Sequence, residues 1–213
     1  MDLNMTATTQ PEQLELLAKL ADGALTLAAE TSWHRVTLSD VCGASDVRLM
    51  DCAKASITKI HVIAHLDSMI DQAMLGAQAK VDRTQSVRDR LFDVVMSRFD
   101  AMEENRSAWI SILQADKSDT IASLARSARR ARGGAWALEA SGVNASDLKG
   151  AGRAIALAGI MQRVESVWLD DGPDLAKTMA RLDQELRTSE DWVGRIQAVR
   201  GFFGSKPASE PTL

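Results

Sequence analysis

Apolar residues recur at intervals of three to four positions along most of the chain, which is the spacing of one face of an α-helix. Near the start, Leu14, Leu17, Ala21, Leu25 and Ala28 follow this spacing. No segment alternates apolar and polar residues as a half-buried strand does. The pattern predicts an all-α protein whose first helix covers 11–31.

Capping residues and polar breaks divide the rest of the chain into further helices. Thr37 and Asp40 have the spacing of a capping box, so they predict a short second helix that ends at Asp46. A third short helix follows at 47–54, and Ser56 or Thr58 is expected to cap a long fourth one. Later helices are expected at 87–102, 106–114, 119–140, 147–169 (capped by Ser146) and 173–203 (with Pro173 in the first turn).

The composition is that of an ordinary globular protein. Of 213 residues, 46% are hydrophobic and 25% charged, which is enough to bury a core. The two cysteines, Cys42 and Cys52, fit reduced thiols better than a disulfide scaffold. With no signal-peptide pattern and no long apolar run, a cytoplasmic location is expected. A net charge of −4 gives no overall attraction to nucleic acid, so DNA binding would depend on a local basic patch.

The segment from Val36 to Val41, followed by Lys59, resembles the helix-turn-helix of TetR-family repressors. The resemblance implies a three-helix DNA-binding head at 11–58 and a helical ligand-binding and dimerisation body at 59–204, with flexible tails at 1–10 and 205–213. Segments 90–100, 168–171 and 178–183 resemble an alphaproteobacterial subgroup of the family. That subgroup is distantly similar to a TetR-fold lipid-binding accessory protein of ubiquinone biosynthesis.

The resemblance places DNA contacts at Thr37, Arg48, Lys54 and Lys59. The second half of the motif departs from the family pattern. The glycine of the turn falls on Asp46, which tolerates a left-handed backbone better than most residues. The tyrosine and phenylalanine of the recognition helix fall on Ala53 and Ser56. Two functions therefore follow: a ligand-responsive transcriptional regulator with a divergent recognition helix, or a lipid- or quinone-binding accessory protein that kept the fold and lost DNA binding.

The body carries large apolar side chains on helices that the family arranges around its ligand pocket. They predict a site for an apolar molecule or lipid. Plain core packing is the alternative for each of them. The predicted pocket residues are Met96, Phe99, Trp109, Ile112, Trp136, Met161 and Trp168.

Small residues and leucines at helical spacing on the last two long helices resemble the dimer interface of the family, so a homodimer is expected. The predicted interface residues are Gly152, Ala156, Gly159, Leu175, Met179, Leu182 and Leu186.

Three further patterns have two interpretations each. The cluster Arg126, Arg129, Arg130 and Arg132 is either a solvated helix face or a site for an anion or a partner. His61 and His65 could chelate a metal, but their apolar neighbours favour packing, so no metal is predicted. The stripe Trp192, Ile196, Val199 and Phe203 either docks on the body or contacts a membrane or a partner. No catalytic motif is present, and neither an enzyme activity nor a cofactor is predicted.

Overall fold

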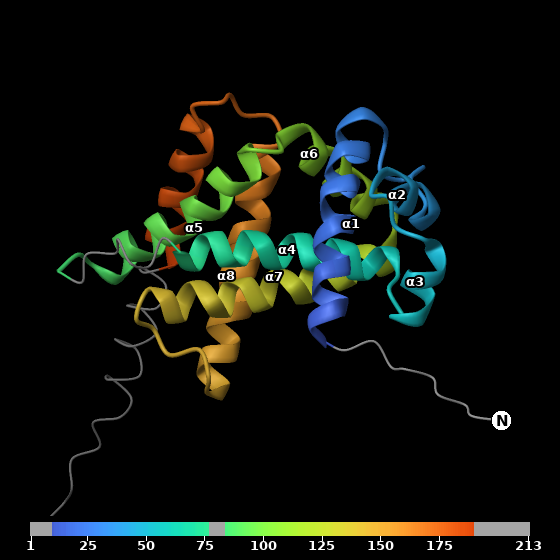
Figure 1. Cartoon of the computed structure of the whole chain (residues 1–213). Coiled ribbons are helices and arrows are strands. Elements are labelled where there is room, and N and C mark those ends of the chain that lie inside the picture. The colour runs from blue at the N-terminus through green and yellow to red at the C-terminus, as the bar shows by residue number, and fades with distance from the viewer. Residues whose placement is uncertain (1–9, 77–83, 190–213) are drawn as a thin grey trace, which may run out of the picture.

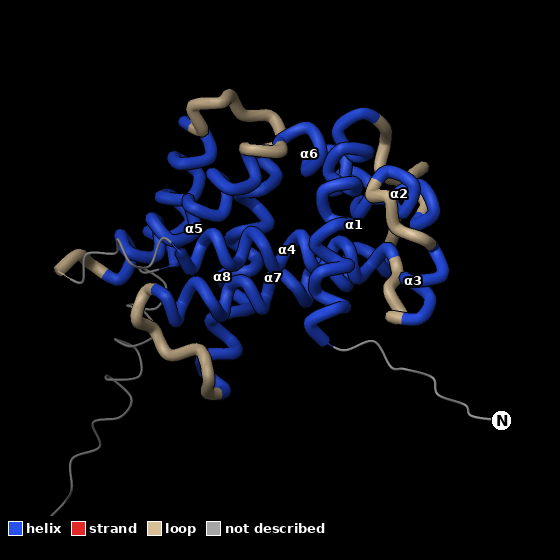
Figure 2. The backbone as a smooth tube through the Cα atoms, viewed as in Figure 1, coloured by secondary structure: helices blue, strands red, loops and turns tan. Residues whose placement is uncertain are grey.

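The computed structural model describes residues 10–76 and 84–189, and every regular element within these ranges is a helix (Figures 1 and 2). The all-α prediction is confirmed. The helices are α1 (Gln10–Glu30), α2 (Leu38–Ala44), α3 (Leu49–Lys54), α4 (Lys59–Gly76), α5 (Val87–Glu103), α6 (Arg106–Ser118), α7 (Thr120–Ala140) and α8 (Leu148–Trp168). A further helical segment covers 176–189. None of these described helices is long and apolar enough to cross a bilayer.

The helix-turn-helix forms largely as its caps predict. Asp40 Oδ2 accepts a hydrogen bond from the Thr37 backbone N–H at 2.8 Å, and Thr37 Oγ1 accepts one from the Asp40 N–H at 3.2 Å. This reciprocal pair satisfies two backbone donors at the start of α2. Asp46 has a φ of 51°, so the aspartate adopts the left-handed conformation that the turn requires.

Two predicted helix starts are wrong. The cap of α8 is Asp147, whose Oδ1 accepts a hydrogen bond from the Gly150 N–H, whereas the Ser146 hydroxyl donates to Glu139. Pro173 lies in a turn ahead of the last described helical segment, because Leu175 has a φ of 53° and breaks the helix there. Instead, Asp171 reaches forward and its carboxylate accepts a hydrogen bond from the Thr178 N–H at 2.7 Å.

The body is built around close contact between α7 and α8. A Cβ at Gly134 would lie 2.8 Å from the Ala154 carbonyl oxygen, so the two backbones approach each other more closely than any larger side chain would allow. The core of the body includes Phe99, Met102 and Trp168, all at most 1% exposed. The contact fixes which face of α7 is buried.

α4 runs from the head into the body, packing on α1 near its start and on α5 and α7 farther along (Figure 1). At its first residue, the Lys59 ammonium donates hydrogen bonds to the carbonyl oxygens of Trp33 (2.7 Å) and Val36 (2.5 Å). It also lies 4.3 Å from the centre of the Trp33 ring. The Trp33 N–H donates to Ser111 Oγ on α6 at 2.8 Å. These contacts hold the loop between α1 and α2 against the body.

Candidate functional site

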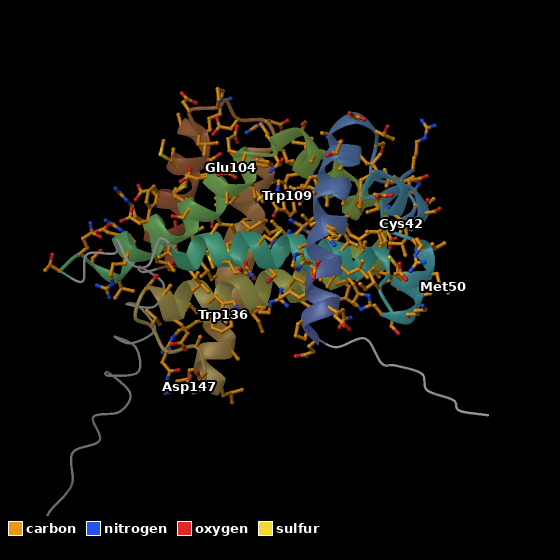
Figure 3. The ribbon with its side chains drawn as sticks, in the orientation of Figure 1. Cys42, Met50, Glu104, Trp109, Trp136 and Asp147 are labelled. Carbon is orange, nitrogen blue, oxygen red and sulfur yellow. The ribbon has the colours of Figure 1, made fainter. Side chains whose placement is uncertain are left out.

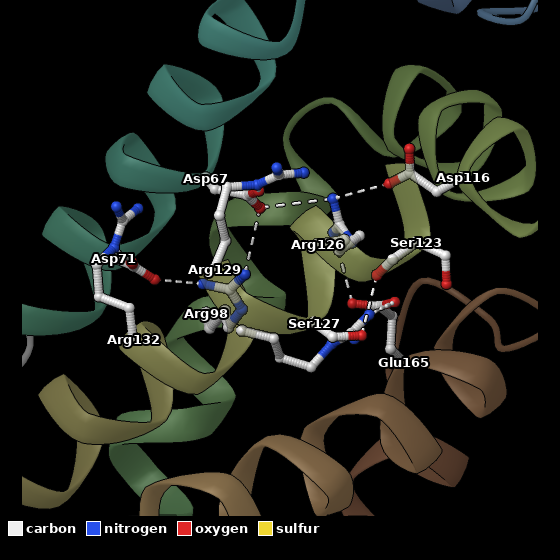
Figure 4. Close-up of polar contacts among 11 residues, drawn as sticks. Asp67, Asp71, Arg98, Asp116, Ser123, Arg126, Ser127, Arg129, Arg132 and Glu165 are labelled. Carbon is white, nitrogen blue, oxygen red and sulfur yellow. Dashed lines mark hydrogen bonds and ion pairs between the residues drawn. The ribbon is translucent and has the colours of Figure 1, made fainter. Parts of the chain in front are cut away.

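Four arginines and four carboxylates meet inside the body, where α4, α5, α6, α7 and α8 converge (Figure 4). We call this group the buried charge cluster. Its members are Asp67, Asp71, Arg98, Asp116, Arg126, Arg129, Arg130 and Glu165.

Asp67 on α4 is the centre of this cluster. Its carboxylate lies 2.6 Å from Arg129 Nε and 3.5 Å from both Arg98 Nη2 and Arg126 Nη1. The neighbouring Asp71 pairs with Arg98 Nη1 at 2.5 Å. Because Arg98 belongs to α5 and the other two arginines to α7, one carboxylate joins three helices.

The local sequence explains how these groups come together. Asp67 and Asp71 are four residues apart on α4, and Arg126 and Arg130 are four apart on α7, so each pair lies on one helical face. Interpreting the α7 arginines as a solvated face was wrong for two of them, because Arg126 is 3% and Arg130 7% exposed. Arg132 alone keeps a half-exposed side chain. Asp67 and Asp71, one turn apart on the face of α4 that also carries Ile63, Ile70 and Met74, were the signal that could have indicated buried partners.

Burial and charge act in opposite directions on the carboxylates. Burial raises the pKa of Asp67, but the positive charges of Arg126, Arg98 and Arg129 outweigh it, so the net pKa is below the ordinary aspartate value. Burial dominates at Asp71 and Asp116 and raises the pKa of both. Asp67 is therefore the most firmly ionised of the three.

Arg126 is the least satisfied member of the cluster. Its nearest carboxylate oxygens, on Asp67, Asp116 and Glu165, lie 3.5, 3.6 and 3.5 Å away, longer than direct hydrogen bonds. Among the described residues, no acceptor forms a hydrogen bond with any of its three side-chain nitrogens. The guanidinium carbon lies 5.6 Å from the centre of the Trp109 ring. A buried guanidinium without hydrogen bonds is costly unless something else supplies them.

A cavity of about 410 Å³ opens beside Arg126, between α6, α7 and α8. We call it the α6–α8 cavity. Most of the residues that line it are polar, among them Lys117, Ser123, Arg126, Ser127, Arg130 and Gln162.

A second cavity, of about 420 Å³, lies at the junction of head and body. Trp33, Lys59 and Ile63 line it on one side, and α6 and α7 line it on the other. Asp116 lines both cavities, so it forms part of the wall between them.

The residues predicted to line an apolar pocket differ in their burial. Trp136 is 47% exposed on α7 in the single chain, so its place in a pocket stays a prediction. The other six residues are buried, but none lines either cavity. They pack into the core, and in Figure 3 Trp109 lies among the helices. These six residues are Met96, Phe99, Trp109, Ile112, Met161 and Trp168.

The predicted dimer residues divide into two groups. Leu175, Leu182 and Leu186 are at most 6% exposed within the single chain, so they pack inside the protomer rather than on an interface. Gly152, Ala156 and Met179 are exposed, and Gly159 is half-buried. Ile155, which sequence analysis did not single out, is 66% exposed beside them on α8.

The residues predicted to contact DNA have different surroundings. The Thr37 side chain accepts a hydrogen bond from the Asp40 N–H as the N-cap of α2. Lys54 is exposed in the last turn of α3. Arg48 forms two hydrogen bonds with the Asp51 carboxylate, both at 2.8 Å, on the surface of α3. Lys59 is partly buried, and burial lowers its pKa. The DNA contacts of these residues stay predictions.

Between these charges, α3 presents apolar side chains to solvent. Leu49 is 49% and Met50 63% exposed, and Met50 lies at the outer edge of the head in Figure 3. Cys52, in contrast, is fully buried with its Sγ 3.3 Å from that of Cys42. Burial, and then the hydrogen bond with Cys42, raises the pKa of Cys52 to about 12.

The two remaining predictions concern metal binding and the apolar stripe near the end of the chain. Within residues 10–76 and 84–189, no three histidine, cysteine or acidic side chains gather as a metal site. The stripe at Trp192, Ile196, Val199 and Phe203 lies outside the described residues.

Comparison of the whole structure identifies the fold. A TetR transcriptional regulator from Rhodococcus sp. RHA1 is similar with a TM-score of 0.64, over 84% of this chain and 97% of that one. The two sequences are 15% identical. A search of protein families and a search of curated proteins both find no match. The chain is thus a distant protein of the TetR fold, as the sequence resemblance indicated.

Proposed function

We propose that this protein is a ligand-responsive transcriptional regulator that binds DNA through α2 and α3. The observation that carries the proposal is the position of α4. Its first residue, Lys59, holds the loop that precedes α2, while Asp67 on the same helix holds the buried charge cluster beside the α6–α8 cavity. A ligand that alters the cluster would act on the helix that supports the head.

The exposed side of α3 supports a DNA-facing role with modest direct reading of bases. Leu49 and Met50 can contact thymine methyl groups, and Lys54 can reach phosphate oxygens. Arg48 is already paired with Asp51, so it must exchange that carboxylate for a phosphate or a base. Phosphate contacts would therefore supply most of the affinity.

Capture of genomic DNA fragments on the purified protein tests the function. We expect a discrete set of fragments to be enriched, and Met50→Glu to abolish the enrichment because a carboxylate on α3 would repel phosphates. Leu124→Glu, at a 72% exposed position on α7, is the matched control and should bind normally. Equal retention of all fragments by the wild type and Met50→Glu would contradict the proposal.

We also propose a homodimer through the outer face of α8 and the segment 176–189. Gly152 and Ala156 would let a second helix approach closely, and Ile155 and Met179 supply exposed apolar surface. Ile155→Glu should shift the protein to monomer in sedimentation velocity, since a carboxylate would be buried unpaired in the interface. Leu124→Glu again serves as the control. A wild type that is monomeric at micromolar concentration would refute this arrangement.

The alternative function, a lipid-binding accessory role, has no support from the described residues. Of its aromatic residues, Phe99, Trp109 and Trp168 are packed in the core and Trp136 is exposed. Its amphipathic stripe lies outside the described ranges.

A further inference from the structure

We infer that the α6–α8 cavity binds the oxyanion group of a small molecule, a carboxylate or a phosphate, through Arg126. This inference names the ligand class of the proposed regulator and rests on that function. It also revises the apolar ligand that the sequence predicted.

Arg126 is buried without a hydrogen-bond acceptor in the described chain. The side chain is 3% exposed, yet no acceptor in the described chain bonds to Nε, Nη1 or Nη2. A planar guanidinium presents paired N–H groups that match an oxyanion in a bidentate arrangement. Arg126 lines the α6–α8 cavity, which has room for a ligand of small-molecule size. Its three nitrogens are buried in this conformation, so the guanidinium must turn toward the cavity to bind a ligand there.

Cationic side chains outnumber carboxylates around the α6–α8 cavity. Arg126 and Arg130 come from its α7 wall and Lys117 from α6, against Asp116 and Glu165. Glu165 already pairs with Arg130 at 2.8 Å. Arg163 from α8 also lines the cavity, so four cationic side chains stand against two carboxylates. The balance of charge thus favours an anion over a cation.

The wall of the α6–α8 cavity also carries uncharged polar side chains. Ser123 and Ser127 lie one turn apart on α7, and Gln162 lies across from them on α8. The Ser127 hydroxyl already donates to the Ser123 carbonyl at 2.9 Å, whereas the Ser123 hydroxyl can donate to an oxyanion (Figure 4). The Gln162 amide can donate to an oxyanion as well. Leu113 and Leu169 give the cavity an apolar part that suits the remainder of an organic acid or phosphate ester.

Calorimetry on the full chain without DNA tests the inference with three probes: sodium benzoate, inorganic phosphate and the neutral isostere benzamide. We expect saturable binding of benzoate or phosphate at fixed ionic strength and none of benzamide. Binding of benzoate alone assigns a carboxylate ligand, and binding of phosphate alone assigns a phosphate ligand. Because Trp109 lies beside Arg126, binding should also change fluorescence in the wild type but less in Trp109→Phe.

Two variants separate the site from general charge effects. Arg126→Met should weaken oxyanion binding at least about tenfold, as expected for loss of a charge-assisted hydrogen-bonded pair. Arg187→Met, at an exposed residue on the last described helical segment, is the matched control. If Arg126→Met does not fold, Ser127→Leu fills the same cavity without removing a charge and should also prevent binding.

The outcomes distinguish this inference from the proposed function. Failure of both oxyanions to bind the wild type, or undiminished binding in Ser127→Leu and any folded Arg126→Met, overturns the inference even if DNA is bound. Oxyanion binding by a protein that captures no specific DNA supports the inference and refutes the regulator.

Discussion

Replacing Asp67 with asparagine is expected to lower the free energy of unfolding by about 3–5 kcal/mol, the cost of breaking a buried ion pair. Asp67 is 2% exposed and lies within 3.5 Å of Arg98, Arg126 and Arg129. Asparagine keeps the shape and one acceptor oxygen but removes the charge that balances these guanidinium groups. Urea unfolding followed by circular dichroism measures the difference.

Asp183→Asn is the matched control, because Asp183 pairs with Arg187 on an exposed helix face. Its effect should lie within about 1 kcal/mol. A similarly small effect at Asp67 would contradict the central role that we give this carboxylate.

The difference in free energy of unfolding between the wild type and Asp67→Asn is expected to depend on pH. The folded-state pKa of Asp67 is lowered, so its contribution is fully present above the unfolded-state value of about 3.9. That contribution is lost as the pH falls through the lower folded-state pKa. The difference between wild type and Asp67→Asn should therefore be constant near neutral pH and shrink only below about pH 4.

Local features of this fold could be predicted from the sequence. The α2 cap involves residues three positions apart, Thr37 and Asp40, so its geometry depends on the chain nearby rather than on tertiary packing. The left-handed turn at Asp46 is likewise a property of one residue and its neighbours. The helix-turn-helix could thus be predicted from the sequence, although the second half of the motif departs from the family pattern.

The candidate site could not be predicted in the same way, because it depends on pairings between distant segments. Whether the arginines of α7 meet water or Asp67 is decided by how α7 packs on α4, about 60 positions earlier in the chain. The α7–α8 contact buries Gly134 and Ala137, whose small size permits it. That choice of face turns the larger Trp136 outward, although its size alone favoured the core.

Replacing Lys59 with methionine separates two roles that the sequence and the structure assign to this residue. The sequence resemblance makes Lys59 a phosphate contact, whereas in the structure its ammonium donates to the carbonyl oxygens of Trp33 and Val36. We expect Lys59→Met to lower the free energy of unfolding by about 1–3 kcal/mol, because two partly buried acceptors lose their donor. DNA binding should weaken with it, since the loop that positions α2 is released.

The salt dependence of DNA binding decides between these roles. Each phosphate neutralised by a lysine contributes about −0.9 to the slope of log K against log salt concentration. Lys59→Met should therefore leave the slope unchanged, while Lys54→Met, at an exposed position on α3, should reduce its magnitude by about one. The measurement uses one captured genomic fragment across a range of salt concentrations. If Lys59→Met reduces the slope and leaves stability intact, Lys59 is a phosphate ligand and the head is held on the body by other contacts.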